Sequence, residues 1–193
     1  ATGPVIKNGF YYDFYTKEKI TEDMFNFLEE KMKNISSSNI NICRLNISKN
    51  FANKLFIGNK YKLDILKNLN FQTISCYKQD RFIDLCLGPH VLNTKNLKYF
   101  KLLKVSGAYW KNNKNNEMLY RVYGTAHESY KSLTEYLSQL DKIKTHDHKK
   151  IGKQMALFLF YNHAPGVVFW NTRGWRTYFN IINYLRKLMR NAG

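Results

Sequence analysis

The sequence lacks long hydrophobic segments and contains few cysteines and few acidic residues. No continuous apolar run approaches the ~20 residues that a membrane helix needs, so we expect no membrane partner. The three cysteines form no Cys-x-x-Cys pair, and a 193-residue chain with 44% hydrophobic residues can build a core without disulfides. A reducing, cytoplasmic location is therefore expected. The chain begins at Ala1 without a basic and apolar leader, which favours a mature, tagged or cut chain over a secretory precursor.

Acidic side chains are outnumbered by basic ones. The 14 Asp and Glu face 31 Lys and Arg, for a formal net charge of +17. Of the basic residues 24 are Lys, and the chain also contains 22 Asn. An AT-rich coding sequence favours both residue types. Part of the positive charge can therefore reflect this bias, with the lysines simply solvating the surface. A charge of this size still attracts polyanions over a long range. We expect a nucleic-acid partner, with a merely solubilising surface as the alternative.

Hydrophobic residues recur at strand or helix spacing along most of the chain. The pattern predicts an α+β fold, a mostly antiparallel sheet covered by helices and followed by a long helical linker. Strands are predicted at 5–6, 10–15, 40–47, 71–77, 99–110, 118–125 and 167–170, with turns at Asn8-Gly9, Gln79-Asp80 and 171–174. Helices are predicted at 21–35, 51–56 and 175–190, and from a capping box at Thr125 through 143, while 61–66 fits either element.

The stretch Arg-Phe-Ile-Asp-Leu-Cys-Leu-Gly-Pro-His, residues 81–90, carries a carboxylate, a thiol and an imidazole close together. An extended segment places Asp84 and Cys86 on one face, and the Gly-Pro that follows predicts a turn that can bring His90 back towards Cys86. This arrangement predicts a compact polar site. A buried structural cysteine followed by a turn histidine is the alternative interpretation.

Basic and aromatic residues alternate between positions 95 and 121. Seven basic side chains face one acidic side chain there, Glu117, and tyrosines and a tryptophan are interleaved with them. Basic groups bind phosphates and aromatic rings offer stacking surfaces, so this strip is a candidate RNA-binding surface. Its candidate contacts are Lys101, Lys104, Lys111 and Arg121. The alternative is that the aromatic residues are ordinary members of the sheet core.

The sequence His-Asp-His at 146–148 has metal-ligand residue types. Neighbouring residues on a helix point apart, however, and the lysines at 142, 144, 149 and 150 repel a cation. We therefore expect a solvated helix junction there and no metal in this chain.

Six segments resemble threonyl-tRNA synthetase, occur in that family's order and together extend over nearly the whole chain. They are Gly-Pro-Val-Ile-Lys-Asn-Gly-Phe-Tyr-Tyr-Asp at 3–13, Asp-Leu-Cys-Leu-Gly-Pro-His at 84–90, Phe-Lys-Leu-Leu-Lys-Val-Ser-Gly-Ala-Tyr-Trp at 100–110, Arg-Val-Tyr-Gly-Thr at 121–125, Asp-His-Lys-Lys-Ile-Gly-Lys at 147–153 and Ala-Pro-Gly-Val-Val-Phe-Trp at 164–170. The resemblance implies an editing domain at 1–126, linker helices at 127–163 and the N-terminal stub of a class II catalytic domain at 164–193.

The resemblance also implies a function in protein biosynthesis and a set of site residues. The full enzyme attaches threonine to its tRNA with ATP, and its editing module hydrolyses seryl-tRNA of the threonine type. On this resemblance His90 orients or deprotonates the attacking water, Cys86 contacts the substrate or the water, and Asp84 holds the seryl amino group. Lys62 assists at the ester or the RNA end, and Tyr12 lines the pocket.

Parts of the family pattern fall outside these residues. A His-x-x-x-His pair of the editing pocket belongs just upstream of Gly3-Pro4, so editing is expected only once that segment is restored. ATP, Mg and Zn are expected only in the missing catalytic domain, together with the anticodon-binding domain, and the full enzyme is expected to be a homodimer. The partners of this chain are then threonine tRNA and the remainder of the synthetase. The alternative function is a non-catalytic RNA-binding relic of an editing domain, for example one associated with the ribosome.

Overall fold

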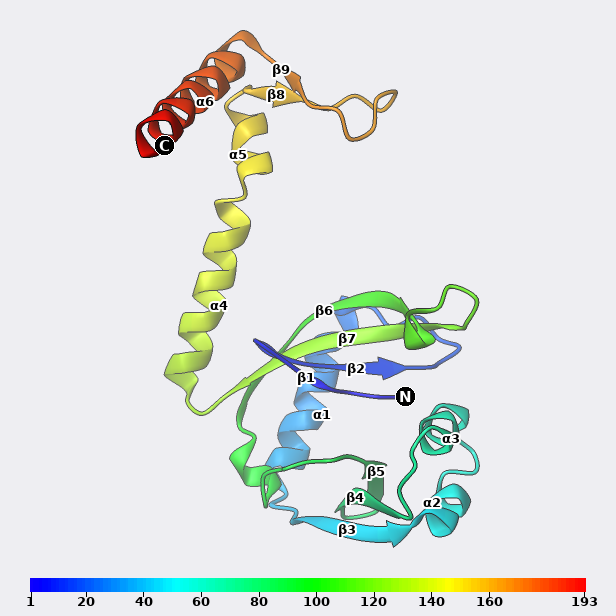
Figure 1. Cartoon of the computed structure of the whole chain (residues 1–193). Coiled ribbons are helices and arrows are strands. Elements are labelled where there is room, and N and C mark those ends of the chain that lie inside the picture. The colour runs from blue at the N-terminus through cyan, green and yellow to red at the C-terminus, as the bar shows by residue number, and fades with distance from the viewer. The chain divides into compact units, whose positions relative to one another are not determined.

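The computed structural model describes all 193 residues and divides into two compact units, Ala1–Thr134 and Glu135–Gly193. Each unit has its own sheet structure (Figure 1). The fold is α+β with antiparallel strands, as predicted. The strands form three separate sheets, however, and not the single sheet expected from the sequence. Strand order depends on contacts between distant segments, which the local pattern does not contain.

The first sheet of unit 1 has the order β1-β2-β7-β6. Its strands are β1 (Val5–Ile6), β2 (Gly9–Phe14), β6 (Tyr99–Tyr109) and β7 (Met118–His127). The β1–β2 hairpin is confirmed, but Ile6 pairs with Gly9, so its turn consists of Lys7 and Asn8. Between β6 and β7 lies a loop that opens with a 3-10 turn, η3 (Trp110–Asn112).

One helix covers the first sheet. It begins as a 3-10 turn, η1 (Glu22–Met24), and continues as α1 (Phe25–Ser37). Phe25 packs with Leu102 of β6 and Val122 of β7 in a small apolar cluster. The predicted helix is therefore confirmed, although the side chain of Thr21 makes no capping hydrogen bond.

The second sheet of unit 1 has the order β3-β4-β5. It contains β3 (Ile42–Ser48), β4 (Thr73–Gln79) and β5 (Phe82–Leu85), and α2 (Lys49–Leu55) and α3 (Lys60–Lys67) lie at one end of it (Figure 1). Its core contains Ala52, Leu66 and Cys76, each fully buried. Burial raises the pKa of the Cys76 thiol, the nearby Asp84 carboxylate adding to the effect, so Cys76 is a core residue and not a nucleophile.

The segment 61–66, which fits either element by its sequence, is helical because the N-terminus of its helix, α3, is capped and one side is buried. Asn59 accepts a hydrogen bond from the backbone N–H of Lys62 through its side chain. Leu66 is then carried into the core of the second sheet, while Tyr61 and Lys62 are buried elsewhere in unit 1. The helix thereby presents a phenol and an ammonium group at consecutive positions.

Unit 2 is built from short elements and one long helix. After α4 (Tyr130–Thr145), which begins in unit 1, come α5 (His148–Gln154), β8 (Phe158–Leu159), β9 (Phe169–Trp170) and α6 (Thr172–Ala192). The expected helix junction is confirmed: Asp147 caps α5 by accepting hydrogen bonds from Lys149 and Lys150. None of the helices combines the length and the apolar character of a membrane-spanning segment.

The predicted beginnings of α4 and α6 are wrong. The Thr125 capping box does not start a helix: Thr125 is a buried residue of β7, and α4 begins at Tyr130, where Ser129 accepts a hydrogen bond from the N–H of Ser132. The predicted turn at 171–174 is instead the first part of α6. A glycine is needed at position 174 inside that helix. The carbonyl oxygen of Leu157 approaches so closely that the Cβ atom of any other residue would clash with it.

Candidate functional site

The turn after β5 brings a thiol and an imidazole together, as the sequence predicts. The Sγ atom of Cys86 lies 2.9 Å from Nε2 of His90, and the backbone N–H of Gly88 points to the same sulfur at 3.4 Å. His90 is exposed and Cys86 is partly buried, so both can be reached by water or by a ligand. A side chain that can accept a proton is thus held next to a sulfur in an accessible position.

Tyr77 of β4 holds the imidazole from the side. Its ring stacks on that of His90, with ring centroids 4.2 Å apart and planes inclined by 20°. The segment is fixed on its other side by Ser75, whose hydroxyl donates to the carbonyl of Cys86 at 2.7 Å. Gly88 allows this close packing because it adopts a positive φ of 74° and has no Cβ atom to clash with the Tyr77 ring.

Asp84 is the centre of a second polar cluster. Its carboxylate pairs with Nζ of Lys62 at 2.5 Å and accepts hydrogen bonds from the hydroxyl of Tyr12 and the backbone N–H of Leu85, each at 2.7 Å. The side chain of Lys62 is 5% exposed and that of Asp84 is 17% exposed. Burial, together with the hydrogen bond to Asp84, raises the pKa of Tyr12. The Tyr12 hydroxyl therefore stays protonated and donates a hydrogen bond to the carboxylate.

The register of β4 and β5 places both clusters on the same side of the second sheet. Tyr77 pairs with Asp84 across the two strands. Side chains of directly opposite residues point to the same face of an antiparallel pair, and the Tyr77 ring also contacts His90. The structure therefore brings together the five residues that the sequence predicted for the site, which are Tyr12, Lys62, Asp84, Cys86 and His90.

The comparison with protein families identifies part of this region. Residues 74–123 match the family described as the threonyl and alanyl tRNA synthetase second additional domain. These residues run from β4 into β7, so they include Asp84, Cys86 and His90. Tyr12 and Lys62 lie outside the matched residues and reach the site through the tertiary fold.

The comparison with curated proteins extends the similarity to the whole chain. The chain is 44% identical over 194 aligned residues to the threonine-tRNA ligase of Alkalilimnicola ehrlichii and, equally, to that of Legionella pneumophila strain Corby. It is 45% identical to the threonine-tRNA ligase of Ehrlichia chaffeensis over the same length. Each alignment includes 99% of this chain. The resemblance to threonyl-tRNA synthetase is confirmed. The chain spans only about 30% of the length of these relatives.

Of the four candidate RNA contacts, three are engaged with carboxylates. Arg121 makes two hydrogen bonds to Asp13, at 2.7 and 2.8 Å, and these bonds hold the pKa of its guanidinium above the usual value. Lys101 pairs with Glu29 at 2.9 Å and Lys111 with Asp64 at 2.6 Å. The ammonium group of Lys104 lies over the ring of Tyr123 instead, 4.7 Å from its centroid. Contact of these four residues with a threonine tRNA stays a prediction.

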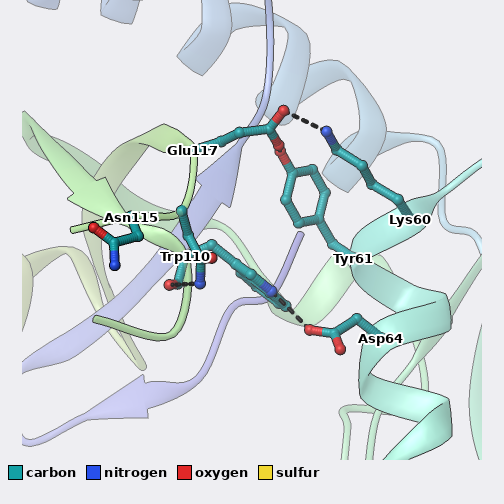
Figure 2. A pocket seen from close by; sticks show the side chains of 7 residues that line it. Lys60, Tyr61, Asp64, Trp110, Asn115 and Glu117 are labelled. Carbon is teal, nitrogen blue, oxygen red and sulfur yellow. Dashed lines mark hydrogen bonds and ion pairs between the residues drawn. The ribbon is translucent and has the colours of Figure 1, made fainter. Parts of the chain in front are cut away.

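A cavity between α3 and the β6–β7 loop was not predicted from the sequence. This cavity has a volume of about 350 Å³, and the residues that line it include Tyr61, Trp110 and Glu117 (Figure 2). Its walls come from segments about 50 residues apart, so a local pattern cannot reveal it. Tyr77 was missed for a similar reason, since only the strand register shows that it faces Asp84.

The described residues contain no group of three or more His, Cys, Asp or Glu side chains arranged to hold a metal ion. Cys86 and His90 offer two of the ligand types that a zinc site uses. The expectation that this chain needs no metal has not been tested.

Substituting Gly88 by alanine is expected to displace His90. An alanine at φ 74° is strained, and its Cβ atom would clash with the ring of Tyr77. We expect a loss of about 1–3 kcal/mol in the free energy of unfolding, measured by urea denaturation, together with loss of the ring contact in NMR spectra. Gly58→Ala is the control, because Gly58 is surrounded by open space. Equal stability of the two variants would contradict this account of the turn.

Proposed function

We propose that this chain is the editing part of a threonine-tRNA ligase and hydrolyses the ester of seryl-tRNA of the threonine type. The observation that carries the proposal is the 2.9 Å contact between Cys86 and His90, beside the buried cluster of Asp84, Lys62 and Tyr12. An exposed imidazole next to a fixed carboxylate and ammonium group suits acid-base hydrolysis of an ester whose acyl group carries a positive amine. The similarity to threonine-tRNA ligases supports the same substrate class.

Such an activity would correct errors in the selection of threonine over serine. Serine differs from threonine by one methyl group, and a difference of that size is worth only about 1–3 kcal/mol in a binding site. A synthetic site for threonine therefore accepts some serine. A second site that removes serine from the tRNA corrects the error, while threonine is retained if the additional methyl group does not fit.

The chemistry can be written with these side chains. The imidazole of His90 takes a proton from a water molecule, and the water oxygen attacks the ester carbonyl carbon. The bond from that carbon to the ribose oxygen breaks, and the imidazolium returns the proton to the ribose oxygen, releasing serine and tRNA. Asp84 accepts the seryl ammonium group at the lone pairs that Tyr12 and Lys62 leave open. Lys62 balances the charge of Asp84 and approaches the ester, and Cys86 orients His90 or the water.

The wider assignments follow from the relatives and are proposals too. The parent enzyme would attach threonine to its tRNA with ATP as a class II synthetase and a cytoplasmic homodimer. In that enzyme residues 127–163 would be the linker helices that connect the editing domain to the catalytic domain, and residues 164–193 would be the N-terminal stub of the catalytic domain. The exposed aromatic and aliphatic side chains of α6, Trp175, Phe179 and Leu185 among them, would then be covered by the remainder of the protein.

The test compares release of labelled serine and labelled threonine from the same threonine tRNA. The chain is assayed alone and extended by the upstream segment that carries the His-x-x-x-His pair in the family. We expect serine release at least about 10-fold above the spontaneous rate for the extended form, and much slower threonine release. Salt-sensitive tRNA binding without any serine release would instead support the non-catalytic RNA-binding alternative.

A further inference from the structure

The cavity between α3 and the β6–β7 loop and the proposed hydrolytic site both use side chains of α3. Its wall includes Tyr61, and the following residue, Lys62, pairs with Asp84. Figure 2 shows Tyr61 and Trp110 side by side in the wall of this cavity, with Asp64 below and Glu117 above. At about 350 Å³ the cavity is within the lower part of the size range of small-molecule sites. Consecutive residues of α3 thus belong to the cavity and to the Asp84 cluster.

The aromatic rings of the cavity are held in fixed positions. The rings of Tyr61 and Trp110 meet edge to face, with centroids 5.0 Å apart. The indole N–H of Trp110 donates to Asp64 at 2.8 Å, and the hydroxyl of Tyr61 donates to Glu117 at 2.5 Å. Asn116 also donates to the Trp110 carbonyl at 2.9 Å. Because these contacts already order the side chains, a planar ligand could stack on the rings at little entropic cost.

The polar groups of the cavity suit a base with an exocyclic amino group. Hydrogen bonds from Lys111 and Trp110 hold the pKa of Asp64 below its usual value. Hydrogen bonds from Lys60 and Tyr61 do the same for Glu117. Both carboxyl groups are therefore ionised and accept hydrogen bonds. Carboxylates accept hydrogen bonds from the amino group of cytosine, and side-chain amides such as that of Asn115 pair with adenine. Uracil presents a carbonyl oxygen at the corresponding position and would be repelled by a carboxylate.

The lysines at the rim can contact the backbone of such a ligand. Lys60 pairs with Glu117 at 2.5 Å and Lys111 with Asp64 at 2.6 Å, but their side chains are 58% and 46% exposed. Exposed ion pairs of this kind contribute little stability, so each ammonium group can turn towards a phosphate with a small loss. The cavity thus combines stacking surfaces, hydrogen-bond acceptors for an amino group and mobile cations.

We propose that this cavity binds the penultimate cytidine of the single-stranded CCA end of a tRNA, while the terminal adenosine carries the seryl ester to Asp84, Cys86 and His90. This inference rests on the proposed function, because it concerns the substrate of the same site. It assigns a separate role to Trp110 and Tyr61 as the stacking surface for a second nucleotide. It also predicts that an RNA terminus binds more tightly than its last nucleoside alone.

The first experiment measures binding directly. Trp170→Phe and Trp175→Phe together leave Trp110 as the only tryptophan of the chain. Titration with short RNAs ending in CCA is expected to quench the fluorescence of Trp110, and an RNA ending in CUA is expected to bind about 10-fold more weakly. Equal binding of the two RNAs, or no change in Trp110 fluorescence, would overturn the proposal. This measurement does not depend on hydrolysis, so it separates the cavity from the proposed activity.

The second experiment uses the extended, hydrolytic form and two substrates. Trp110→Ala is expected to raise the KM for seryl-tRNA about 10-fold and to leave hydrolysis of seryl-adenosine, which lacks the penultimate nucleotide, unchanged. Trp110→Phe retains a stacking ring without the bond to Asp64 and should behave nearly as the unmodified chain. Tyr109→Ala is the matched control, since Tyr109 is an exposed neighbour that does not line the cavity.

The outcomes of the second experiment distinguish the two proposals. If Trp110→Ala leaves the KM for seryl-tRNA unchanged while His90→Ala stops the reaction, the cytidine site is wrong and the proposed function stands. If Trp110→Ala slows both substrates equally, the residue supports the fold and does not bind a nucleotide. If the unmodified extended form hydrolyses neither substrate, the proposed function fails and the fluorescence titration alone decides the cavity.

Discussion

Replacing His90 by alanine is expected to reduce serine release from seryl-tRNA by about 10²–10⁴-fold, the usual contribution of a general base. The imidazole is the exposed proton acceptor next to Cys86, and Tyr77 fixes its orientation. Cys86→Ala is expected to slow the reaction as well, since it removes the sulfur that lies against Nε2. Both effects should be measured as single-turnover rates on the extended form, so that tRNA binding and product release do not hide the chemical step.

Controls for these variants are available in the same chain. Cys43→Ala removes an exposed thiol from β3, and His163→Ala removes an exposed imidazole from unit 2. Neither substitution should change the rate. Unchanged rates in both His90→Ala and Cys86→Ala would eliminate the proposed site, whatever activity the protein retains.

Replacing Lys62 by methionine is expected to destabilise unit 1 by about 3 kcal/mol. Removing one partner of a buried ion pair leaves the other charge uncompensated, which costs about 3–5 kcal/mol. We expect the lower end of this range, because Tyr12 and the backbone of Leu85 still donate to Asp84. Serine release should be lost too, since Asp84 would no longer be held in place. Urea denaturation followed by circular dichroism measures the change in stability.

The neighbouring Lys60 provides the matched control. Lys60→Met removes an exposed ion pair with Glu117 and should cost less than about 1 kcal/mol. The double variant Lys62→Met with Asp84→Asn removes both buried charges, and it should lose less stability than the sum of the two single variants. If Lys62→Met is no more destabilising than Lys60→Met, the buried pair is not a structural part of the site.

The position of one turn limited what could be predicted about the site. The sequence placed the β4–β5 turn at Gln79-Asp80, which would pair Tyr77 with Phe82. The structure forms the turn at Asp80 and Arg81, with Asp80 at a positive φ of 52°, and Tyr77 pairs with Asp84. Because the ring of Tyr77 also stacks on His90, the support of the imidazole could not be derived without the correct register.

Local signals were reliable where a few consecutive residues decide the structure. The helix predicted at 51–56 forms as α2, and Ser48 caps it by accepting a hydrogen bond from the N–H of Phe51. The capping-box spacing at Thr125 was misleading, because pairing of β7 with β6 extends that strand through Thr125 as far as His127. Strand pairing involves residues far apart in the sequence and outweighs the small free energy of a local cap.

The sequence by itself determined the α+β composition, the order of most elements, the resemblance to threonyl-tRNA synthetase and the contact between Cys86 and His90. These features depend on hydrophobic periodicity, on motifs and on residues only a few positions apart. Only the tertiary structure decided that Tyr12 and Lys62 meet at Asp84, that Tyr77 supports His90 and that Trp110 contacts Tyr61 in the wall of a cavity. Each of these contacts joins separate strands, helices or loops, and their geometry depends on strand order and register, which are set by packing of the whole unit.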